Sequence, residues 1–408
     1  MTFLIQINFL SCRGAAQSGE IMAEADPAPT HEPKNSKFKQ QALPAWQPIL
    51  TAGTVLPTFF VIGVAFIPIG VGLMYFSDTV KEVSIEYTDC NMDSDANKMC
   101  KDVITNLDEG YTNGKRNQCN CTLYIKEEDI GNEHWADNVF IYYGLTNFYQ
   151  NHRRYVKSRD DKQLYGDLSN KNEDCAPFLK KTDEDGTEKT YAPCGAIANS
   201  LFNDTIVLEY CEKKSCQNTD TWKTVKVTGR GIAWESDKEY KFKNPGGKNS
   251  VADIRKAWEE AGAIKPMDWQ KEVWELDPAD EDNNGLQNED LIVWMRTAAL
   301  PNFRKLYRKV MYGNDGSFSA SEGLRHDYSY RLKIGYNFEV SQFQGTKSVI
   351  ISTTSILGGK NPFLGIAYIV VGCICFLMGI IFLFIHLKFG RTTQEMMNID
   401  PRSQYNEN

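Results

Sequence analysis

Two long apolar runs without a charged side chain constrain this chain more than any other feature. No Asp, Glu, Lys or Arg occurs from Gln40 to Ser77 or from Asn361 to Ile385. A helix needs about 20 apolar residues to cross the hydrocarbon core of a bilayer, and both runs are long enough. We therefore predict two transmembrane helices, at residues 49–77 and 361–387.

The basic residues beside these runs predict how the chain crosses the membrane. Lys34, Lys37 and Lys39 precede the first run, and Lys388 and Arg391 follow the second. Because Lys and Arg are enriched on the cytosolic side of transmembrane helices, both termini are expected in the cytosol.

The chain then divides into five predicted regions. Between the two helices, residues 78–360 form one lumenal or extracellular domain. Residues 1–48 form a cytosolic tail, expected to be disordered because it is poor in apolar residues and contains five prolines. Residues 388–408 form a second, short cytosolic tail.

Cysteine usage in residues 78–360 points to disulfide bonds. Eight of the eleven cysteines lie in this domain: Cys90, Cys100, Cys119, Cys121, Cys175, Cys194, Cys211 and Cys216. No CxxC pair occurs, and the domain has three histidines, so zinc binding by these cysteines is disfavoured. An even number of cysteines outside the cytosol predicts disulfides. No metal site and no cofactor are expected.

Both N-x-[ST] sequons of the chain lie in the same domain. They are "NCT" at Asn120 and "NDT" at Asn203. Since such sequons are glycosylated in the secretory pathway, we predict an N-glycan on each asparagine.

The residue pattern between the two runs favours strands over helices. Strands are indicated by "NVFIYYGLTNFY", "LIVWMRTAAL", "YRLKIGYNFEVSQF" and "SVIISTT", and helices by "VADIRKAWEEAG" and "LPNFRKLYRKV". The predicted fold class is a membrane protein in which two transmembrane helices flank a large antiparallel β-rich (α+β) ectodomain, disulfide-bonded and glycosylated.

Motifs for catalysis or ion conduction are missing from the sequence. It contains no GxSxG, HExxH or GxxxxGK[ST], and the two predicted spans lack charged residues. Asp280, Asp282, Asn284 and Gly285 fit the first half of a calcium loop, but the twelfth position is Leu291, which favours a solvated acidic turn. A net charge of −8 does not favour nucleic acid as a partner. The alternative that the topology leaves open is a two-span ligand-gated ion channel subunit, which would need a polar pore lining.

Glycines recur on one face of the second predicted helix. Gly365, Gly372 and Gly379 are spaced seven residues apart, which keeps them near one face. Small residues let helix backbones approach closely in lipid. This face can pack on the first span or dock a partner's membrane helix, and the sequence leaves both alternatives open.

Several long stretches together resemble one known family. They are "NVFIYYGLTNFYQNHRRYVKSRD", "APCGAIANSLFNDT", "GIAWESDKEYKFKNP", "DNNGLQNEDLIVWMRTAALPNFRKLYR" and "GGKNPFLGIAYIVVG". In this order they resemble the cell division control protein 50 family, the β-subunits of phospholipid flippases (type IV P-type ATPases). The resemblance extends from about Lys37 to Phe389.

This resemblance implies a function and a partner. The chain would be a non-catalytic accessory subunit that forms a heterodimer with the catalytic α-subunit of a type IV P-type ATPase. It would be needed for the folding of the ATPase, its exit from the endoplasmic reticulum and its activity in aminophospholipid translocation. Membrane lipids would surround the complex in the endoplasmic reticulum, Golgi, endosomes and plasma membrane.

The resemblance also implies disulfide pairs. Two nested bridges, Cys90–Cys121 and Cys100–Cys119, and a third, Cys175–Cys194, correspond to bridges of the family. Cys211 and Cys216 do not match the family pattern, and their closeness in sequence suggests a local fourth bridge.

Overall fold

The architecture described here comes from a computed structural model. It describes residues 36–39, 41, 43, 51–105, 111–112, 115–116, 119–132, 134–135, 138–214, 216, 221–313 and 323–390. Most of the predicted tails, residues 1–48 and 388–408, therefore lie outside the described residues.

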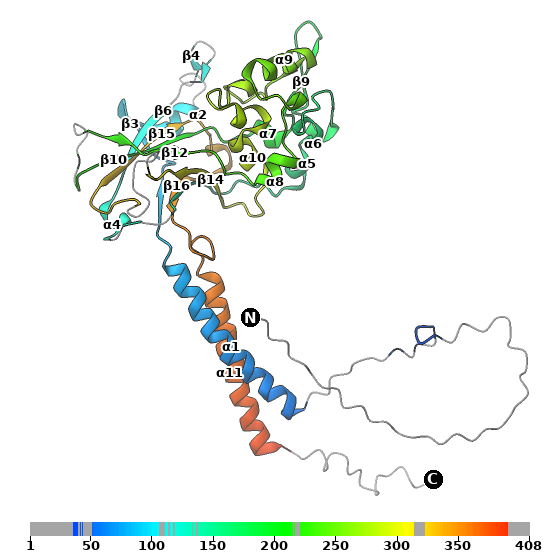
Figure 1. Cartoon of the computed structure of the whole chain (residues 1–408), viewed down its shortest axis with the longest axis vertical. Coiled ribbons are helices and arrows are strands. Elements are labelled where there is room, and N and C mark those ends of the chain that lie inside the picture. The colour runs from blue at the N-terminus through cyan, green and yellow to red at the C-terminus, as the bar shows by residue number, and fades with distance from the viewer. Residues whose placement is uncertain are drawn as a thin grey trace, which may run out of the picture. The chain divides into compact units, whose positions relative to one another are not determined.

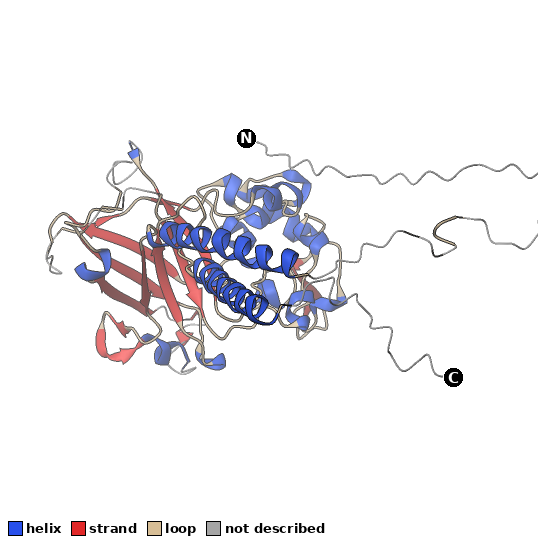
Figure 2. Ribbon diagram, turned by 90° about the horizontal axis from the view of Figure 1, so that it is seen from below, coloured by secondary structure: helices blue, strands red, loops and turns tan. Residues whose placement is uncertain are grey.

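Two long helices, α1 (Ala52–Asp78) and α11 (Phe363–Phe389), stand apart from the rest of the fold and lie side by side (Figures 1 and 2). Each has 27 residues and is long and apolar enough to cross a membrane. At 1.5 Å per residue each helix is about 40 Å long, more than the roughly 30 Å of a bilayer core. They coincide with the predicted spans to within three residues at either end.

The chain between them contains two larger antiparallel sheets. One sheet has the strand order β1-β16-β7-β14-β12, with bounds Glu82–Glu86, Lys347–Ser352, Phe140–Leu145, Phe303–Val310 and Val227–Thr228. The other has the order β11-β10-β15-β6, with bounds Lys223–Thr224, Thr205–Cys211, Ser329–Tyr336 and Cys119–Ile125. Strand β1 follows α1, and strand β16 precedes α11. Because these two strands pair with each other, the first and last strands of the ectodomain lie side by side next to the two helices.

Smaller elements complete the ectodomain. Three short sheets consist of β13-β9-β8 (Ala263–Ile264, Glu188–Tyr191, Lys180–Thr182), β2-β3 (Asn91–Met92, Asp95–Met99) and β4-β5 (Tyr111–Thr112, Lys115–Arg116). The helices are α2 (Cys100–Thr105), α4 (Glu127–Ile130), α5 (Arg153–Lys157), α6 (Asp161–Leu164), α7 (Ala196–Asn199), α8 (Glu235–Tyr240), α9 (Val251–Ala261) and α10 (Glu289–Met295). The 3-10 turns are η1 (Glu173–Cys175), η2 (Pro245–Gly247), η3 (Val273–Glu275), η4 (Glu281–Asn283), η5 (Gly285–Gln287) and η7 (Ser341–Phe343). Helices α5 to α10 gather on one side of the ectodomain, beside the sheets (Figure 1).

Buried tryptophans hold helices α9 and α10 to the segment around α7. The indole N–H of Trp258 donates to the carbonyl oxygen of Ala192 at 3.1 Å, and that of Trp294 donates to Ile197 at 2.8 Å. Both rings are almost fully buried. Each indole therefore contributes a large apolar surface without leaving its one donor unpaired.

Two apolar helices that flank an antiparallel β-rich, disulfide-bonded ectodomain are confirmed, and so are most of the predicted elements; glycosylation stays a prediction. The strands expected in "NVFIYYGLTNFY", "YRLKIGYNFEVSQF" and "SVIISTT" are β7, β15 and β16, and the helix expected in "VADIRKAWEEAG" is α9.

Two predictions of secondary structure are wrong. The segment "LIVWMRTAAL" contains α10 and is not a strand. The Asn288 side chain accepts a hydrogen bond from the backbone N–H of Leu291 and caps this helix. Because Leu291, Ile292, Trp294 and Met295 are all buried, the helix has no polar face that the sequence could reveal.

The segment "LPNFRKLYRKV" forms β14 and is not a helix. Phe303, Leu306, Tyr307 and Val310 have helical spacing, but the strand pairs with β7 on one side and β12 on the other. A register shift between Leu306 and Arg308 interrupts the two-residue alternation, so Tyr307 and Val310 are both buried although they are three positions apart.

Candidate functional site

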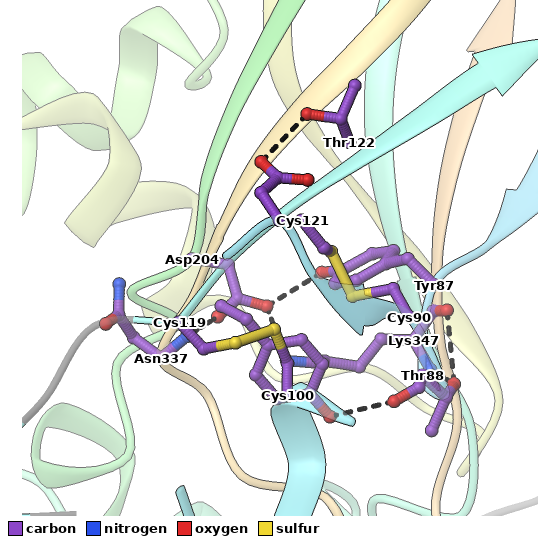
Figure 3. The surroundings of a disulfide bond; sticks show 12 residues. Tyr87, Thr88, Cys90, Cys100, Cys119, Cys121, Thr122, Asp204, Asn337 and Lys347 are labelled. Carbon is purple, nitrogen blue, oxygen red and sulfur yellow. Dashed lines mark hydrogen bonds and ion pairs between the residues drawn. A yellow bond between two sulfur atoms is a disulfide. The ribbon is translucent and has the colours of Figure 1, made fainter. Parts of the chain in front are cut away.

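Two nested disulfides lie in the core of the ectodomain (Figure 3). Strand β6 alternates, so Cys119 and Cys121 are buried on one face while Asn120 between them is exposed. Cys121 is bonded to Cys90 with Cα atoms 6.1 Å apart, and Cys119 is bonded to Cys100 with Cα atoms 5.5 Å apart. Strand β6 is thereby bonded to both ends of the segment 90–100, which contains β2 and β3 and ends at the first residue of α2.

The other four ectodomain cysteines also form two bridges. Cys175 is bonded to Cys194 and Cys211 to Cys216, with Cα atoms 5.8 and 6.4 Å apart. The structure thus contains the pairs that the family resemblance implied, together with the local fourth bridge.

A buried carboxylate beside the nested disulfides joins four strands. Oδ1 of Asp204 accepts hydrogen bonds from the backbone N–H groups of Asn337 and Phe338, at 2.5 and 2.6 Å. Its Oδ2 accepts from the hydroxyl of Tyr87 at 2.8 Å and from Nζ of Lys347 at 2.7 Å. These residues lie at or beside the ends of β10, β15, β1 and β16, so the carboxylate holds the two larger sheets together (Figure 3).

Lys347 is the cation of this site and is inaccessible to solvent. Its Nζ also donates to the carbonyl oxygen of Phe338 at 2.6 Å and lies 3.0 Å from the ring centroid of Tyr336. Burial lowers the pKa of Lys347 to about 8, although Asp204 favours its ammonium form. Burial, assisted by Asp204, raises the pKa of Tyr87 well above its usual value, so the phenol remains a donor.

Sequence reasoning missed both Asp204 and Lys347. Asp204 is the middle residue of the sequon "NDT", which predicted only a glycan on Asn203, and Lys347 begins a strand. The two residues are 143 positions apart in the chain. No local pattern pairs them; only the tertiary fold does.

The two sequons differ in their surroundings. Asn120 is exposed on β6, on the face opposite to the cysteines. Asn203 is half-buried at a cavity of about 210 Å³, and its Oδ1 is buried with no hydrogen-bond partner among the described residues.

The glycine face of α11 lies against α1. A Cβ on Gly365 would be 3.0 Å from the carbonyl oxygen of Gly70, and one on Gly372 would be 2.9 Å from Cγ1 of Ile67. A Cβ on Gly379 would be 3.2 Å from the ring of Phe60. Of the two alternatives that the sequence left open, the structure shows these glycines in the packing of the two helices on each other.

The remaining surface of the helix pair is apolar. Residues such as Val61, Val64, Val71, Ile374, Leu377 and Ile381 are exposed on α1 and α11. Such a surface is compatible with lipid chains or with the membrane helices of another protein.

The acidic turn at residues 280–285 uses its polar groups internally. Asp280 pairs with Arg230 and accepts from the backbone N–H of Asp282 at 3.2 Å. The amide of Asn284 donates to the carbonyl oxygen of Trp274 at 2.8 Å. These contacts agree with an acidic turn rather than a calcium loop.

The helix pair and the disulfide-bonded ectodomain define a class: membrane proteins with two spans and one large domain between them. The family comparison is more specific. The model of the LEM3 (ligand-effect modulator 3) family / CDC50 family matches residues 73–392, so the chain belongs to this family.

Relatives from animals and plants match over nearly their whole length. Cell cycle control protein 50A of Mus musculus is 46% identical over 386 residues, 94% of this chain and 97% of the relative. Cell cycle control protein 50B of Homo sapiens is 40% identical over 368 residues, 88% of this chain and 95% of the relative. ALA-interacting subunit 3 of Arabidopsis thaliana is 39% identical over 380 residues, 92% of each chain.

Proposed function

We propose that this protein is the non-catalytic β-subunit of a phospholipid-flipping type IV P-type ATPase and forms a heterodimer with its catalytic α-subunit. It promotes folding of the ATPase and its exit from the endoplasmic reticulum, and it supports aminophospholipid translocation. Both termini face the cytosol, and the complex is found in the endoplasmic reticulum, Golgi, endosomes and plasma membrane.

Family membership over residues 73–392 is the observation that carries this proposal. The plant relative is named as an interacting subunit, and the alignment covers 92% of that protein and 92% of this chain. The similarity to this interacting subunit therefore extends over most of the chain and is not limited to one shared domain.

The helix pair is suited to such a role. Its glycine faces are occupied by each other, while its outer surface presents branched and aromatic side chains. The ectodomain, held by four disulfides and a buried ion pair, is a rigid surface for a partner on the same side of the membrane.

Co-purification tests the proposal directly. The tagged chain is expressed in cells of its own source, extracted in mild detergent and captured, and the largest co-purifying chain is identified. We expect a type IV P-type ATPase in a one-to-one complex, and faster uptake of a labelled aminophospholipid when both chains are expressed than with the ATPase alone. A tagged two-span protein of another family is the control.

Two results would contradict the proposal. One is an ATPase that reaches its membrane and flips lipid equally well without this chain. The other is an ionic current in cells expressing this chain alone, which would favour the ligand-gated channel subunit instead.

A further inference from the structure

Two of the three histidines in residues 78–360 face each other on the surface of the ectodomain. His134 lies in the connection from α4 to β7, and His326 lies in the connection from β14 to β15. Their Nδ1 atoms are 3.2 Å apart, and their ring centroids are 4.5 Å apart. The two residues are separated by 192 positions, so only the fold brings them together.

A carboxylate completes the cluster. One ligand atom each of His134, His326 and Asp327 lies within 4.8 Å of the others. Arg325 holds this carboxylate in a fork, with Nε 3.0 Å from Oδ1 and Nη2 2.9 Å from Oδ2. The hydrogen bonds from Arg325 lower the pKa of Asp327 to about 2. A carboxylate has about four lone-pair positions, more than the hydrogen bonds from Arg325 and from the Asp327 backbone occupy.

The backbone on both sides of the cluster is anchored. The N–H of Trp135 donates to the carbonyl oxygen of Leu324 at 2.9 Å, and both side chains are buried. The N–H of Arg325 donates to the hydroxyl of Tyr330 at 2.8 Å, and that hydroxyl donates to the carbonyl oxygen of Arg325 at 3.0 Å. The side chains of the cluster thus project from a fixed backbone, which reduces the entropy lost when they bind a common ligand.

We propose that His134, His326 and Asp327 form a binding site for one zinc(II) or similar transition-metal ion, with water completing the coordination. Zinc–nitrogen bonds of 2.0–2.1 Å at tetrahedral angles place two ligand nitrogens about 3.4 Å apart, close to the spacing of the two Nδ1 atoms. Two imidazoles with one carboxylate select zinc or copper over calcium and magnesium, which prefer oxygen ligands.

The ion would reinforce the contact between two segments that an isolated backbone bridge, Trp135 with Leu324, already joins. Lys81 donates from Nζ to the carbonyl oxygen of His134 at 2.9 Å, and Lys81 is three residues beyond the end of α1. Three extended residues span at most about 11 Å, so Lys81 is close to the membrane-proximal end of the ectodomain. The site would act as a metal-dependent clamp in this part of the domain, whether or not an ATPase is bound.

Metal titration of the full-length glycosylated chain in detergent tests the site. The chain is stripped with a chelator, exchanged into chelator-free buffer and titrated with zinc chloride by calorimetry. We expect one zinc ion per chain. His134→Ala and His326→Ala should each weaken binding by about 100-fold or more, because loss of a ligand costs at least as much as loss of the groups that orient it.

His152 provides a matched control because it is the third histidine of the domain and is also exposed. His152→Ala should bind zinc as the wild type does. All variants retain His31 and His386, so these residues cannot explain a selective loss.

A second readout separates binding from folding. Zinc should raise the unfolding temperature of the wild type and of His152→Ala, but not of His134→Ala or His326→Ala, whose metal-free unfolding temperatures should match the wild type. Cobalt(II) should give the visible absorption of a low-symmetry site only where both histidines are present. The proposal is overturned if the wild type does not bind zinc at sub-millimolar concentrations, or if the double variant His134→Ala/His326→Ala binds it undiminished.

Discussion

The ectodomain and the helix pair are stabilised in different ways. The ectodomain combines apolar burial with directional interactions: four disulfides, indole hydrogen bonds and the Asp204–Lys347 pair. Helices α1 and α11 contact each other through glycines and aromatic edges, such as Phe60 against Phe376 with centroids 5.6 Å apart.

The surroundings of each region explain this difference. In water, burial of apolar surface drives folding, and a polar group inside must find a partner. In lipid, apolar surface gains little by burial, so close fit and dispersion decide which faces meet. We therefore expect the ectodomain to be most sensitive to lost partners and the helix pair to added volume.

The largest expected effect is removal of the buried cation. Lys347→Met should destabilise the ectodomain by about 3–5 kcal/mol, because Asp204 would remain buried without its countercharge. The measurement is chemical denaturation of the purified chain followed by tryptophan fluorescence. Arg255→Ala, which removes an exposed pair with Glu259, should change stability by less than about 0.5 kcal/mol. Equal effects of the two changes would refute the importance of burial here.

Removal of the outer nested disulfide should have the next largest effect. The inner Cys100–Cys119 bridge shortens the loop that Cys90–Cys121 closes to residues 90–100 and 119–121, so chain entropy predicts a loss of about 3 kcal/mol for Cys90→Ser/Cys121→Ser. The local bridge closes only five positions, so Cys211→Ser/Cys216→Ser should cost about 2.2 kcal/mol. The fraction of each variant that acquires mature glycans reports exit from the endoplasmic reticulum. The reverse order of the two variants would contradict the prediction.

Added volume between the helices should cost about 1–3 kcal/mol. In Gly70→Leu the new side chain would meet Ile369 and the backbone of Gly365. Gly72 provides the matched control, because a Cβ placed there would have no contact within 4 Å among the described residues. Gly70→Leu and Gly372→Leu should lower the temperature at which the isolated chain loses its monodisperse size-exclusion peak, and Gly72→Leu should not.

The same variants also test whether the glycine face of α11 contacts a partner's membrane helix. If Gly372→Leu left the isolated chain as stable as the wild type but reduced the recovery of an ATPase, the glycine face would belong to the partner interface. Loss of stability in the isolated chain would assign it to the contact between α1 and α11.

The smallest expected effect on stability is loss of a glycan. Asn120→Gln changes an exposed side chain, so it should alter the free energy of unfolding by less than about 0.5 kcal/mol. On a gel the variant should show a lower apparent mass, because one glycan is missing. Asn203→Gln should remove the other glycan, and the double variant should be insensitive to glycosidase. A wild-type chain that glycosidase does not shift would contradict a lumenal or extracellular ectodomain.

Local sequence was sufficient to predict the two apolar helices, the β-rich class of the domain between them and the set of cysteines available for bonding. Hydropathy and cysteine usage are properties of short segments or of composition, and a bilayer or an oxidising compartment acts on them directly. Strands such as β15 and β16 were also predictable, because side chains alternate along β15 and β16 has three β-branched residues, Val349 to Ile351, in a row.

The roles of the remaining residues depend on tertiary contacts that no short segment specifies. Helix α10 and strand β14 contradict their local patterns. In α10 most side chains are buried, so no helical alternation of polar and apolar residues is visible. In β14 a register shift interrupts the two-residue alternation of a strand. The fold joins Asp204 to Lys347 across 143 positions and His134 to His326 across 192. It also places the glycine face of α11 on α1. Each of these contacts depends on where two distant segments meet, and that is set by the packing of the whole domain rather than by either segment alone.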